Sequence, residues 1–377
     1  MNRAQLIEPD LEFIRELKTR GGEAVKKCYQ CASCSVVCAL SPADHPFPRK
    51  EMVWAQWGLK ERLLQDPDIW LCYQCHDCSR YCPRGANPGD VLASLRQVAI
   101  IQNAFPRWLA RMMGDPQYLL ILITIPVIIL GLLIWSLGSL QIPPGPIVYR
   151  KFISYEIVDA VFLLTALWVV ICSSIGIRRL YSGFQMTRPL ADVSILSVNG
   201  LKKHLLPTLL EILQHTSFKD CVVNRVRYFA HLNILWGFIL LAFTTASVAA
   251  GIYLFGKQTP WPLYHPVKVI GNIGGLILIT GALIALWRRL AYGSDSEKTT
   301  YSDWLFLLTV LLTGISGLLT EVFRLVNIPR LAYSTYFIHL VLVWILFFSL
   351  PFSKFAHLLY RTTAMIYTRI QRMQESL

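Results

Sequence analysis

The sequence predicts an all-α membrane protein in two parts: a polar, cysteine-rich N-terminal part and a bundle of six apolar helices. Hydrophobic residues make up 54% of the 377 residues, too large a share for one water-soluble domain of this length. The apolar residues gather after residue 110, whereas the first hundred residues are mixed in polarity and carry eight of the ten cysteines. We therefore expect three parts, namely an N-terminal domain at 1–110, a membrane domain at 111–360 and a tail at 361–377.

The eight N-terminal cysteines form two copies of one spacing, C-x2-C-x2-C-x3-C. The first run holds Cys28, Cys31, Cys34 and Cys38, and the second holds Cys72, Cys75, Cys78 and Cys82, followed by Pro83. The short steps bring three thiolates onto one face of an iron–sulfur cube, and the fourth cysteine of each run commonly reaches the other cube. We expect two [4Fe-4S] clusters, one held by Cys28, Cys31, Cys34 and Cys82 and the other by Cys72, Cys75, Cys78 and Cys38.

Structural zinc and disulfides are the alternative uses of closely spaced cysteines. Zinc sites usually close four ligands with paired C-x2-C steps, and the proline after Cys82 is typical of bacterial ferredoxins instead. Disulfides need an oxidising compartment, whereas residues 1–20 are charged and lack the apolar core of a signal peptide. We therefore expect a reduced, cytoplasmic N-terminal domain.

Helices are expected around the cysteine runs, at 11–19, 49–65 and 90–101. The 33 residues between Cys38 and Cys72 are enough for a helix with turns on both sides, which favours a helical two-cluster ferredoxin over the small β-rich type. Residues 105–115, with Trp108 between Arg107 and Arg111, are expected to lie at the membrane interface.

Six apolar segments follow, each long enough to cross the roughly 30 Å of a bilayer core at about 1.5 Å per residue. They are 118–137, 157–177, 230–255, 267–287, 304–322 and 332–352. An even number of crossings puts both chain ends on the same side. Basic residues favour the side of the termini by fifteen to four, which indicates cytoplasmic termini in the inner membrane. Because the basic residues flank the spans, the net charge of +13 does not indicate nucleic-acid binding.

Four histidines lie near the ends of the last four spans at depths that match in pairs. His231 and His357 are expected near the cytoplasmic face, and His265 and His339 near the outer face. His339 and His357 are 18 residues apart, which is five helical turns, so they are expected on one helix face. Polar groups in a bilayer are costly, and two facing imidazoles ligate a haem iron from both sides. We predict two b-type haems, one ligated by His231 and His357 and one by His265 and His339.

Simpler interpretations exist for each histidine taken alone. An interfacial histidine often only hydrogen-bonds to lipid or backbone, and it is the pairing of four by depth that favours haem. His204 and His215, on the loop before the third span, offer a substitute for His231 as a ligand, although an exposed helix face is the preferred interpretation. His45 and His76 lie beside the cysteine runs and are expected to face solvent, the alternative for His76 being a hydrogen bond that tunes the second cluster.

The constellation resembles the iron–sulfur C subunit of heterodisulfide reductase fused to the membrane-bound E subunit of the same enzyme. Over its whole length the chain resembles the C subunit of the quinone-interacting membrane-bound oxidoreductases of sulfur-metabolising anaerobes. The residues that carry the resemblance are the paired cysteine runs, Arg227-Tyr-Phe-Ala-His231, His265-Pro-Val-Lys-Val-Ile-Gly271, His339 and His357. The membrane half is also similar to the gamma subunit of respiratory nitrate reductase. One departure is that no proline directly follows Cys38, the last cysteine of the first run, whereas Pro83 directly follows Cys82.

The resemblance implies a membrane subunit that passes electrons between menaquinol and cytoplasmic flavin- and iron–sulfur-containing subunits, which serve adenylylsulfate reductase. No dinucleotide-binding glycine fingerprint and no nucleophile triad is evident, so the final substrate chemistry is expected on partner subunits. Two alternatives stay open, a membrane subunit of a heterodisulfide reductase and a haem-free membrane anchor for a ferredoxin that docks a soluble partner. Cys172 and Cys221 match no motif and are expected to be inert.

Quinol oxidation releases two protons, so a quinone site needs a titratable group near a haem and an open path to water. Glu321 and Arg324, at the outer end of the fifth span, are the candidates for it. Neighbours of similar depth are Lys268, Tyr333, Tyr336, Glu156 and Asp159. The alternative is an interfacial salt bridge with an aromatic belt.

Overall fold

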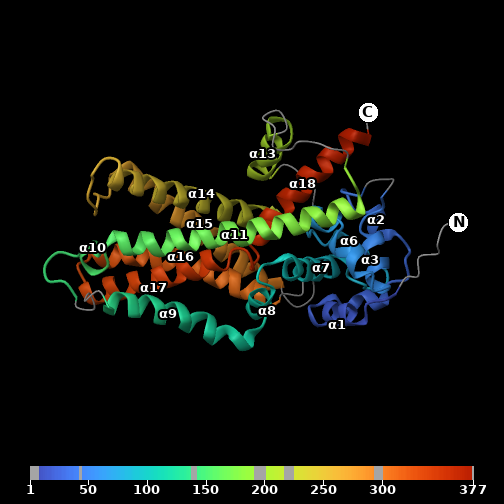
Figure 1. The fold of residues 1–377 in the computed structure, drawn as a ribbon, viewed down its shortest axis with the longest axis horizontal. Helices are drawn as coiled ribbons and strands as arrows, with labels where there is room; N and C mark the ends of the chain where they lie inside the picture. Colours follow the sequence, from blue (N-terminus) through green and yellow to red (C-terminus); the bar gives the residue numbers. More distant parts are fainter. Residues whose placement is uncertain are drawn as a thin grey trace.

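The computed structural model describes residues 8–41, 45–136, 142–190, 201–215, 225–292 and 300–375. The regular elements within these ranges are all helices, as predicted. Figure 1 shows a long helical bundle with a compact N-terminal domain at one end, and both chain ends lie at that end. We call this end of the bundle the domain side and the opposite end the far side. Cys221 lies outside the described residues.

The N-terminal domain consists of short helices joined by tight turns. They are α1 (Leu11–Thr19), η1 (Gly22–Lys27), α2 (Ser33–Val36), α3 (Arg49–Gln56), α4 (Lys60–Leu64), α5 (Asp68–Leu71), α6 (Asp77–Arg80) and α7 (Pro88–Asn103), followed by α8 (Arg107–Met113). The helix expected over 49–65 is divided into α3 and α4, because Gly58 between them has a positive φ of 68° that ends the first helix. The helices expected at 11–19 and 90–101 are confirmed as α1 and α7.

Six helices of the described residues are long and apolar enough to cross a membrane, and they coincide with the six predicted spans. Their bounds are α9 (Leu119–Ser136), α11 (Tyr155–Thr187), α14 (Arg225–Tyr253), α15 (Pro266–Tyr292), α16 (Tyr301–Leu325) and α17 (Pro329–Phe348). The short α10 (Tyr149–Phe152) precedes α11 on the far side, and η2 (Pro116–Tyr118) precedes α9. The chain is therefore a multi-pass membrane protein with a helical N-terminal domain.

Helices α14 and α15 pack closely because glycines line their interface. A Cβ on Gly237 of α14 would lie 2.8 Å from the backbone of Leu278 in α15. Likewise, a Cβ on Gly281 of α15 would lie 2.8 Å from the carbonyl oxygen of Ala230. Small residues let membrane helices approach in this way, where packing replaces the hydrophobic effect. The contact fixes the depth of His231, which follows Ala230 directly.

The last span ends earlier than predicted. Helix α17 stops at Phe348, residues 349–355 form turns, and a separate helix α18 (Ala356–Glu375) begins just before His357. Pro351 lies in this break, where it lacks an N–H and disfavours helical backbone at the residue before it. The prediction that His339 and His357 share one face of a continuous helix is therefore wrong.

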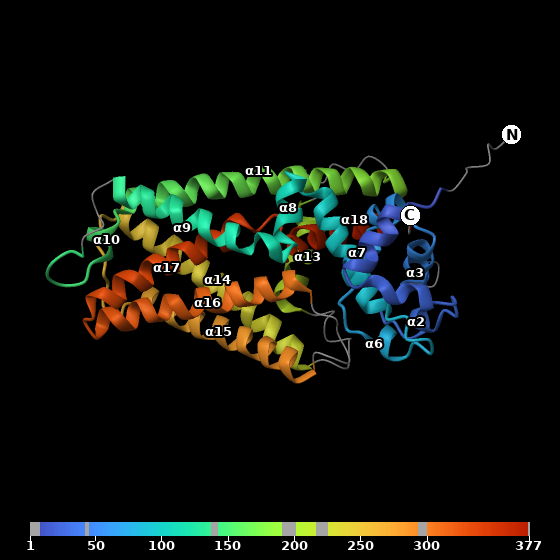
Figure 2. The same ribbon diagram turned by 90° about the horizontal axis from the view of Figure 1, so that it is seen from below.

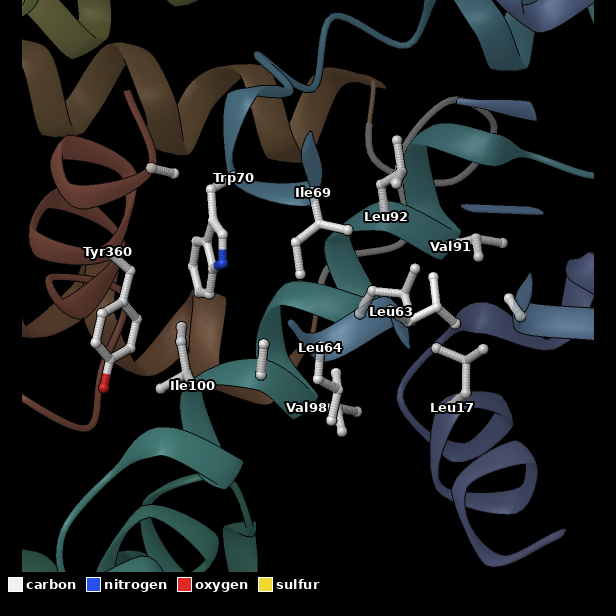
Figure 3. Packing of buried hydrophobic residues seen from close by; sticks show 14 of the residues in the cluster. Leu17, Leu63, Leu64, Ile69, Trp70, Val91, Leu92, Val98, Ile100 and Tyr360 are labelled. Carbon is white, nitrogen blue, oxygen red and sulfur yellow. The ribbon is translucent and has the colours of Figure 1, made fainter. Parts of the chain in front are cut away.

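The N-terminal domain and the membrane half share one hydrophobic core. Helix α11 continues past its predicted end at residue 177 to Thr187, and Leu180 and Phe184 of this extension pack with the buried residues of the N-terminal domain. Tyr360 of α18 meets Trp70 edge to face, with ring centroids 5.1 Å apart (Figure 3). Most of the expected tail, 361–377, thus belongs to a helix that packs on the N-terminal domain.

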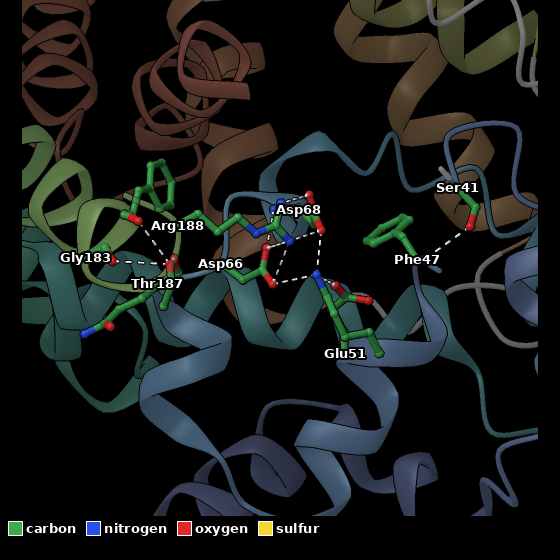
Figure 4. Close-up of polar contacts among 11 residues, drawn as sticks. Ser41, Phe47, Glu51, Asp66, Asp68, Gly183, Thr187 and Arg188 are labelled. Atoms are coloured by element: carbon green, nitrogen blue, oxygen red, sulfur yellow. Dashed lines mark hydrogen bonds and ion pairs between the residues drawn. The ribbon is translucent and has the colours of Figure 1, made fainter. Parts of the chain in front are cut away.

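An ion network attaches the end of α11 to the N-terminal domain (Figure 4). Arg188 contacts Asp66 at 3.1 Å and Asp68 at 2.6 Å. Lys50 contacts the same two carboxylates at 2.7 and 2.6 Å and Glu51 at 3.2 Å. Glu51 is fully buried, and burial raises its pKa to about 8, so at neutral pH two carboxylates face two cations. Figure 2, a view from below, shows the long α11 running from the far side to the N-terminal domain.

Candidate functional site

The two cysteine runs have the same backbone conformation. In each run the residues on either side of the second cysteine have positive φ, namely Gln30, Ala32, Gln74 and His76, at 54–67°. Left-handed residues turn successive backbone N–H groups toward a common interior, where they bind anions. Gln74, one of these residues, donates its N–H to Cys72 Sγ at 3.2 Å, and Ala86, which follows the second run, donates its N–H to Cys82 Sγ at 3.3 Å. Donors aimed at thiolates suit an iron–sulfur cluster.

The cysteines gather in the groups that the crossed assignment requires. Cys38 of the first run lies near Cys72 and Cys75, and Cys78 lies near Cys72, Cys75 and Cys38, so their charges interact. Burial, reinforced by these neighbouring thiolates, raises the pKa of Cys78, and burial raises that of Cys38 to about 11. Thiols buried in this way need a metal to hold them as thiolates. The grouping supports the predicted ligand sets, which stay predictions.

The first run gathers in the same way. Burial, reinforced by nearby Cys28 and Cys31, raises the pKa of Cys34 to about 11. Cys82, the fourth cysteine of the second run, lies close enough to Tyr29 of the first run for their charges to interact. The residues present therefore fit two clusters with exchanged fourth ligands.

Three arginines fix the second run, two from the membrane half and one, Arg96, from within the N-terminal domain. Arg361 of α18 donates to the carbonyl oxygens of Cys72 at 3.1 Å and Leu71 at 3.2 Å, and its guanidinium lies 3.9 Å from the centre of the Tyr73 ring. Arg227 of α14 donates to the carbonyl oxygen of Gln74. Arg96 of α7 donates to the carbonyl oxygen of Ile69 at 3.0 Å and to the Gln74 side chain at 3.2 Å. The second run is thus fixed beside the ends of α14 and α18.

Three histidines converge at the same place. The rings of His231, in α14, and His357, in α18, have centroids 6.3 Å apart. His215, which ends α13 (Leu206–Gln214), places its Nε2 2.7 Å from Nδ1 of His231. His357 directs Nδ1 at the carbonyl oxygen of Lys354. Because a carbonyl only accepts, His357 carries its proton on Nδ1, which leaves Nε2 as its ligating nitrogen.

A cavity of about 340 Å³ joins these histidines to the second cysteine run. Its walls include His215, His231 and His357 on one side and Trp70, Cys72 and Tyr73 on the other. Basic side chains line much of the remainder, among them Arg96, Arg227, Arg288, Arg289, Lys354 and Arg361. Such a wall suits a ligand that carries carboxylates.

The donor set fits a haem. Two imidazoles that bind one metal ion from opposite sides, each through a bond of about 2 Å, place their ring centroids about 6 Å apart. His231 and His357 meet this requirement at 6.3 Å. Burial lowers the pKa of His357 to about 4, which keeps it in the neutral form that ligates metals. The contacts of His231 with His215 and of His357 with the Lys354 carbonyl fix the orientation of the two rings.

The other two histidines are not brought together. His265, just before α15, packs on Trp261 with ring centroids 4.4 Å apart. His339 Nδ1 lies 3.0 Å from Ser316 Oγ of α16, whose hydroxyl donates to the Thr313 carbonyl oxygen. Ser316 is two residues from Gly314, which faces Ile279 of α15.

Along the axis of the bundle, His339 therefore lies at the same depth as the α15 residues near Ile279. His265 lies at least ten residues closer to the far side than these α15 residues. At about 1.5 Å per residue this is roughly 15 Å, more than one iron can bridge. The predicted pairing of His265 with His339 is not formed in this arrangement.

Glu321 and Arg324, the predicted quinone-site residues, belong to an ion-paired group on the far side. Glu321 contacts Lys268 at 2.7 Å and Arg324 at 3.6 Å. Tyr149 stacks on Tyr336 nearby with centroids 4.5 Å apart. This is the geometry of the interfacial salt bridge with aromatic neighbours that was the alternative interpretation.

Three histidines expected to face solvent or a helix surface differ from prediction. His204 is 5% exposed, His215 8% and His76 8%. His76 Nδ1 lies 3.7 Å from Asp90 Oδ1, inside the N-terminal domain. Arg361 was not predicted as a site residue. A signal was present, because Arg361 follows His357 by four residues and so shares its helix face.

The comparisons with known proteins match both halves. The profile of the family described as citrate utilization protein B matches residues 109–376. The chain belongs to the citrate utilization protein B family. A second profile, the 4Fe-4S dicluster domain, matches residues 24–86, which contain both cysteine runs. We therefore call residues 8–113 the ferredoxin domain.

Individual relatives match either nearly the whole chain or only its ferredoxin domain. Citrate utilization protein B of Escherichia coli is 24% identical over 97% of this chain and 94% of its own length. The C subunit of an H(2):CoB-CoM heterodisulfide,ferredoxin reductase from Methanothermobacter marburgensis is 33% identical over 24% of this chain and 49% of its own. A protein of Archaeoglobus profundus that is described as like the C subunit of heterodisulfide reductase is 34% identical over 23% of this chain and 45% of its own. The chain spans about half the length of these two C-subunit relatives. No solved structure matches it.

These matches confirm the resemblance of the ferredoxin domain to the C subunit of heterodisulfide reductase. For the membrane half they give a family that was not predicted from the sequence motifs. The chain is a multi-pass membrane protein with an iron–sulfur domain, and its C-subunit relatives are named as subunits of heterodisulfide reductases.

Proposed function

We propose that this chain carries single electrons between a quinol in the membrane and a partner protein at the ferredoxin domain. One b haem held by His231 and His357 and two [4Fe-4S] clusters held by the eight cysteines would supply the one-electron chemistry. The observation that carries the proposal is the cavity that joins His231 and His357 to Cys72. It lies between the membrane half and the ferredoxin domain and connects the membrane helices directly to the second cysteine run.

The protein residues around this cavity have separate roles in the proposal. His231 and His357 would hold the iron, and His215 would orient His231 through the 2.7 Å contact. Arg361 would fix the distance between the second cysteine run and the histidines, because it is anchored on the same helix as His357 and bonds to Cys72. The basic wall would balance the carboxylates of the bound group.

We propose cytoplasmic termini and an inner-membrane location from the distribution of basic residues. Our specific proposal for the substrates is menaquinol in the membrane and flavin- and iron–sulfur-containing partner subunits that serve adenylylsulfate reductase, as the sequence resemblance implies. The second candidate is a partner that reduces a heterodisulfide. The sequence identity to the C-subunit relatives favours this candidate. Reduction of adenylylsulfate or of a heterodisulfide by the purified complex, with a menaquinol analogue as donor, distinguishes the two.

Glu321 and Arg324 remain our proposed quinone-site residues on the far side, with Glu321 as the proton acceptor. The support is a carboxylate only 12% exposed beside a lysine and an arginine. The test is Glu321→Gln, which should slow quinol oxidation at least tenfold if this group takes the proton. An unchanged rate assigns Glu321 to an interfacial salt bridge instead.

The experiment that tests the proposed function is an anaerobic visible spectrum of the detergent-purified chain, oxidised and dithionite-reduced. Pyridine haemochrome and iron and sulfide analysis should be made on the same sample. We expect about one b haem and about eight cluster irons per chain, from two [4Fe-4S] clusters. Eight irons without haem would make the chain a membrane-anchored ferredoxin, and the haem proposal would be withdrawn.

A further inference from the structure

The surface around the first cysteine run is apolar and open to solvent. Cys31 is exposed, and so are three large side chains of the two runs, Tyr29, Val36 and Tyr81, at 57%, 85% and 61%. Tyr29 lies beside Cys31 and Cys82, so it is next to the proposed first cluster. Helix α2, which ends at Val36, packs on α6, which precedes Tyr81. Exposed aromatic and aliphatic side chains gathered in this way are typical of protein-binding surfaces.

The charged residues at this surface are basic. The Arg84 guanidinium lies 5.9 Å from the centre of the Tyr29 ring. Lys27 precedes Cys28, Arg80 precedes Tyr81, and both are exposed. The nearby exposed carboxylate of Glu23 forms an ion pair with Lys26. We call Lys27, Tyr29, Cys31, Val36, Arg80, Tyr81 and Arg84 the first-run surface.

The second run has the opposite environment. Arg361 of α18 and Arg227 of α14 hold it against the membrane half, and Cys72 lines the cavity that contains His231 and His357. Figure 2 shows α2, which carries Cys34, at the end of the molecule away from the membrane helices. The two runs therefore differ in what they can contact: the second reaches the membrane histidines, and the first reaches solvent.

We propose that the first-run surface is the docking site for an acidic flavoprotein, which exchanges electrons with the chain next to Cys31. This inference rests on the proposed function, since it names the exit of the same electron path. Apolar side chains at the centre with cations at the rim suit a transient redox complex, in which charge accelerates encounter and short-range packing orients the partner. An acidic protein is the complement of a surface that carries Lys27, Arg80 and Arg84.

The test uses the full-length chain in detergent with a purified acidic flavodoxin as the probe. Binding is measured by biolayer interferometry at low and high salt. Electron transfer is measured in parallel by stopped flow after anaerobic dithionite reduction, with each reduced cluster delivering one electron to the flavin. We expect the affinity and the second-order rate to fall at least tenfold between about 0.05 M and 0.5 M salt.

The charge-reversal variant is Lys27→Glu/Arg80→Glu/Arg84→Glu, which should weaken binding at low salt by at least tenfold. The matched control, Arg15→Glu/Lys18→Glu/Arg62→Glu, makes the same change in charge on α1 and α4, where these residues are exposed. It should bind like the wild type. A second pair, Val36→Ser and Tyr81→Ser, should weaken binding at high salt as well, because it removes apolar contact area.

Cluster absorbance and iron content of each variant report on folding, and the salt dependence of the wild type is informative without any variant. No binding by the wild type, equal loss in both charge-reversal variants, or salt-independent binding would each overturn the docking proposal. Failure of the proposed function is distinguishable, because a chain without haem still has reducible clusters and gives the same docking readout.

Discussion

The histidines meet one another on the domain side of the membrane bundle but not on the far side. On the domain side, His215, His231 and His357 come from three helical segments and meet around a cavity. On the far side, His265 packs on Trp261, and His339 contacts Ser316 some 15 Å deeper. Equal depth, as judged from position along a span, is therefore not sufficient for a ligand pair. Two histidines also need helices that face each other at the same level.

The largest expected difference between the two sides is in haem content. His357→Ala should reduce the haem recovered per chain to less than about a tenth of wild type, because one of the two residues that would hold the iron is lost. His231→Ala should do the same. The controls are His265→Ala and His339→Ala, which should retain haem, as measured by pyridine haemochrome. Loss of half of the haem in either control would restore the predicted far-side pair.

The next largest expected difference between the two sides is in how much their ion networks contribute to the unfolding free energy. Arg188→Met leaves Asp66 and Asp68 buried with one cation fewer, so we expect the ferredoxin domain to lose about 3–5 kcal/mol of unfolding free energy. Lys268→Met on the far side leaves Glu321 near Arg324 and should cost about 1 kcal/mol or less. Thermal unfolding in detergent, followed by cluster absorbance and by circular dichroism, measures both. Equal losses would contradict the role of Arg188 in attaching the domain.

His215 offers a test of whether the orientation of His231 matters on the domain side. His215→Gln should keep the haem spectrum but weaken haem retention by about 10–100-fold and shift its midpoint potential, because the His231 ring is no longer held in place. The matched control is His204→Gln, on the same loop, whose charged neighbours are Lys203 and Arg369. A structural role alone would change thermal stability in both variants without moving the potential.

The last test is a pH dependence that arises on the domain side. Burial raises the pKa of Glu51 from its usual 4.5 to about 8 in the folded protein. Between these values the folded state keeps a proton that the unfolded state releases, so stability falls as the pH rises from about 4.5 to about 8. Glu51→Gln should remove this slope in thermal unfolding measured across that range. A slope unchanged in the variant would assign the pH dependence to other groups.

Much of the architecture could be predicted because it depends on neighbours in sequence. The spacing of Cys28, Cys31 and Cys34 defines a cluster loop, and runs of about twenty apolar residues define spans, whatever surrounds them. The left-handed residues Gln30 and Gln74 follow from the same local requirement. These features were predicted or are explained without any long-range contact.

Other features depend on contacts between distant segments. The break at Pro351 moves His357 onto α18, where it faces His231 instead of continuing the face of His339. The burial of His215 and the bonds from Arg361 to the second cysteine run join residues far apart in the chain.

Local sequence was thus enough to define which chemistry is present: eight thiolates for clusters, six spans, and histidines within or beside the spans. Which histidines meet, which cysteine run faces the membrane and which faces solvent depend on tertiary packing. The physical reason is that cofactor ligation and packing are sensitive to differences of a few ångströms between helices. Those distances depend on helix ends, on close contacts such as Gly281 against Ala230, and on side-chain bonds between domains, none of which a local pattern of residues specifies.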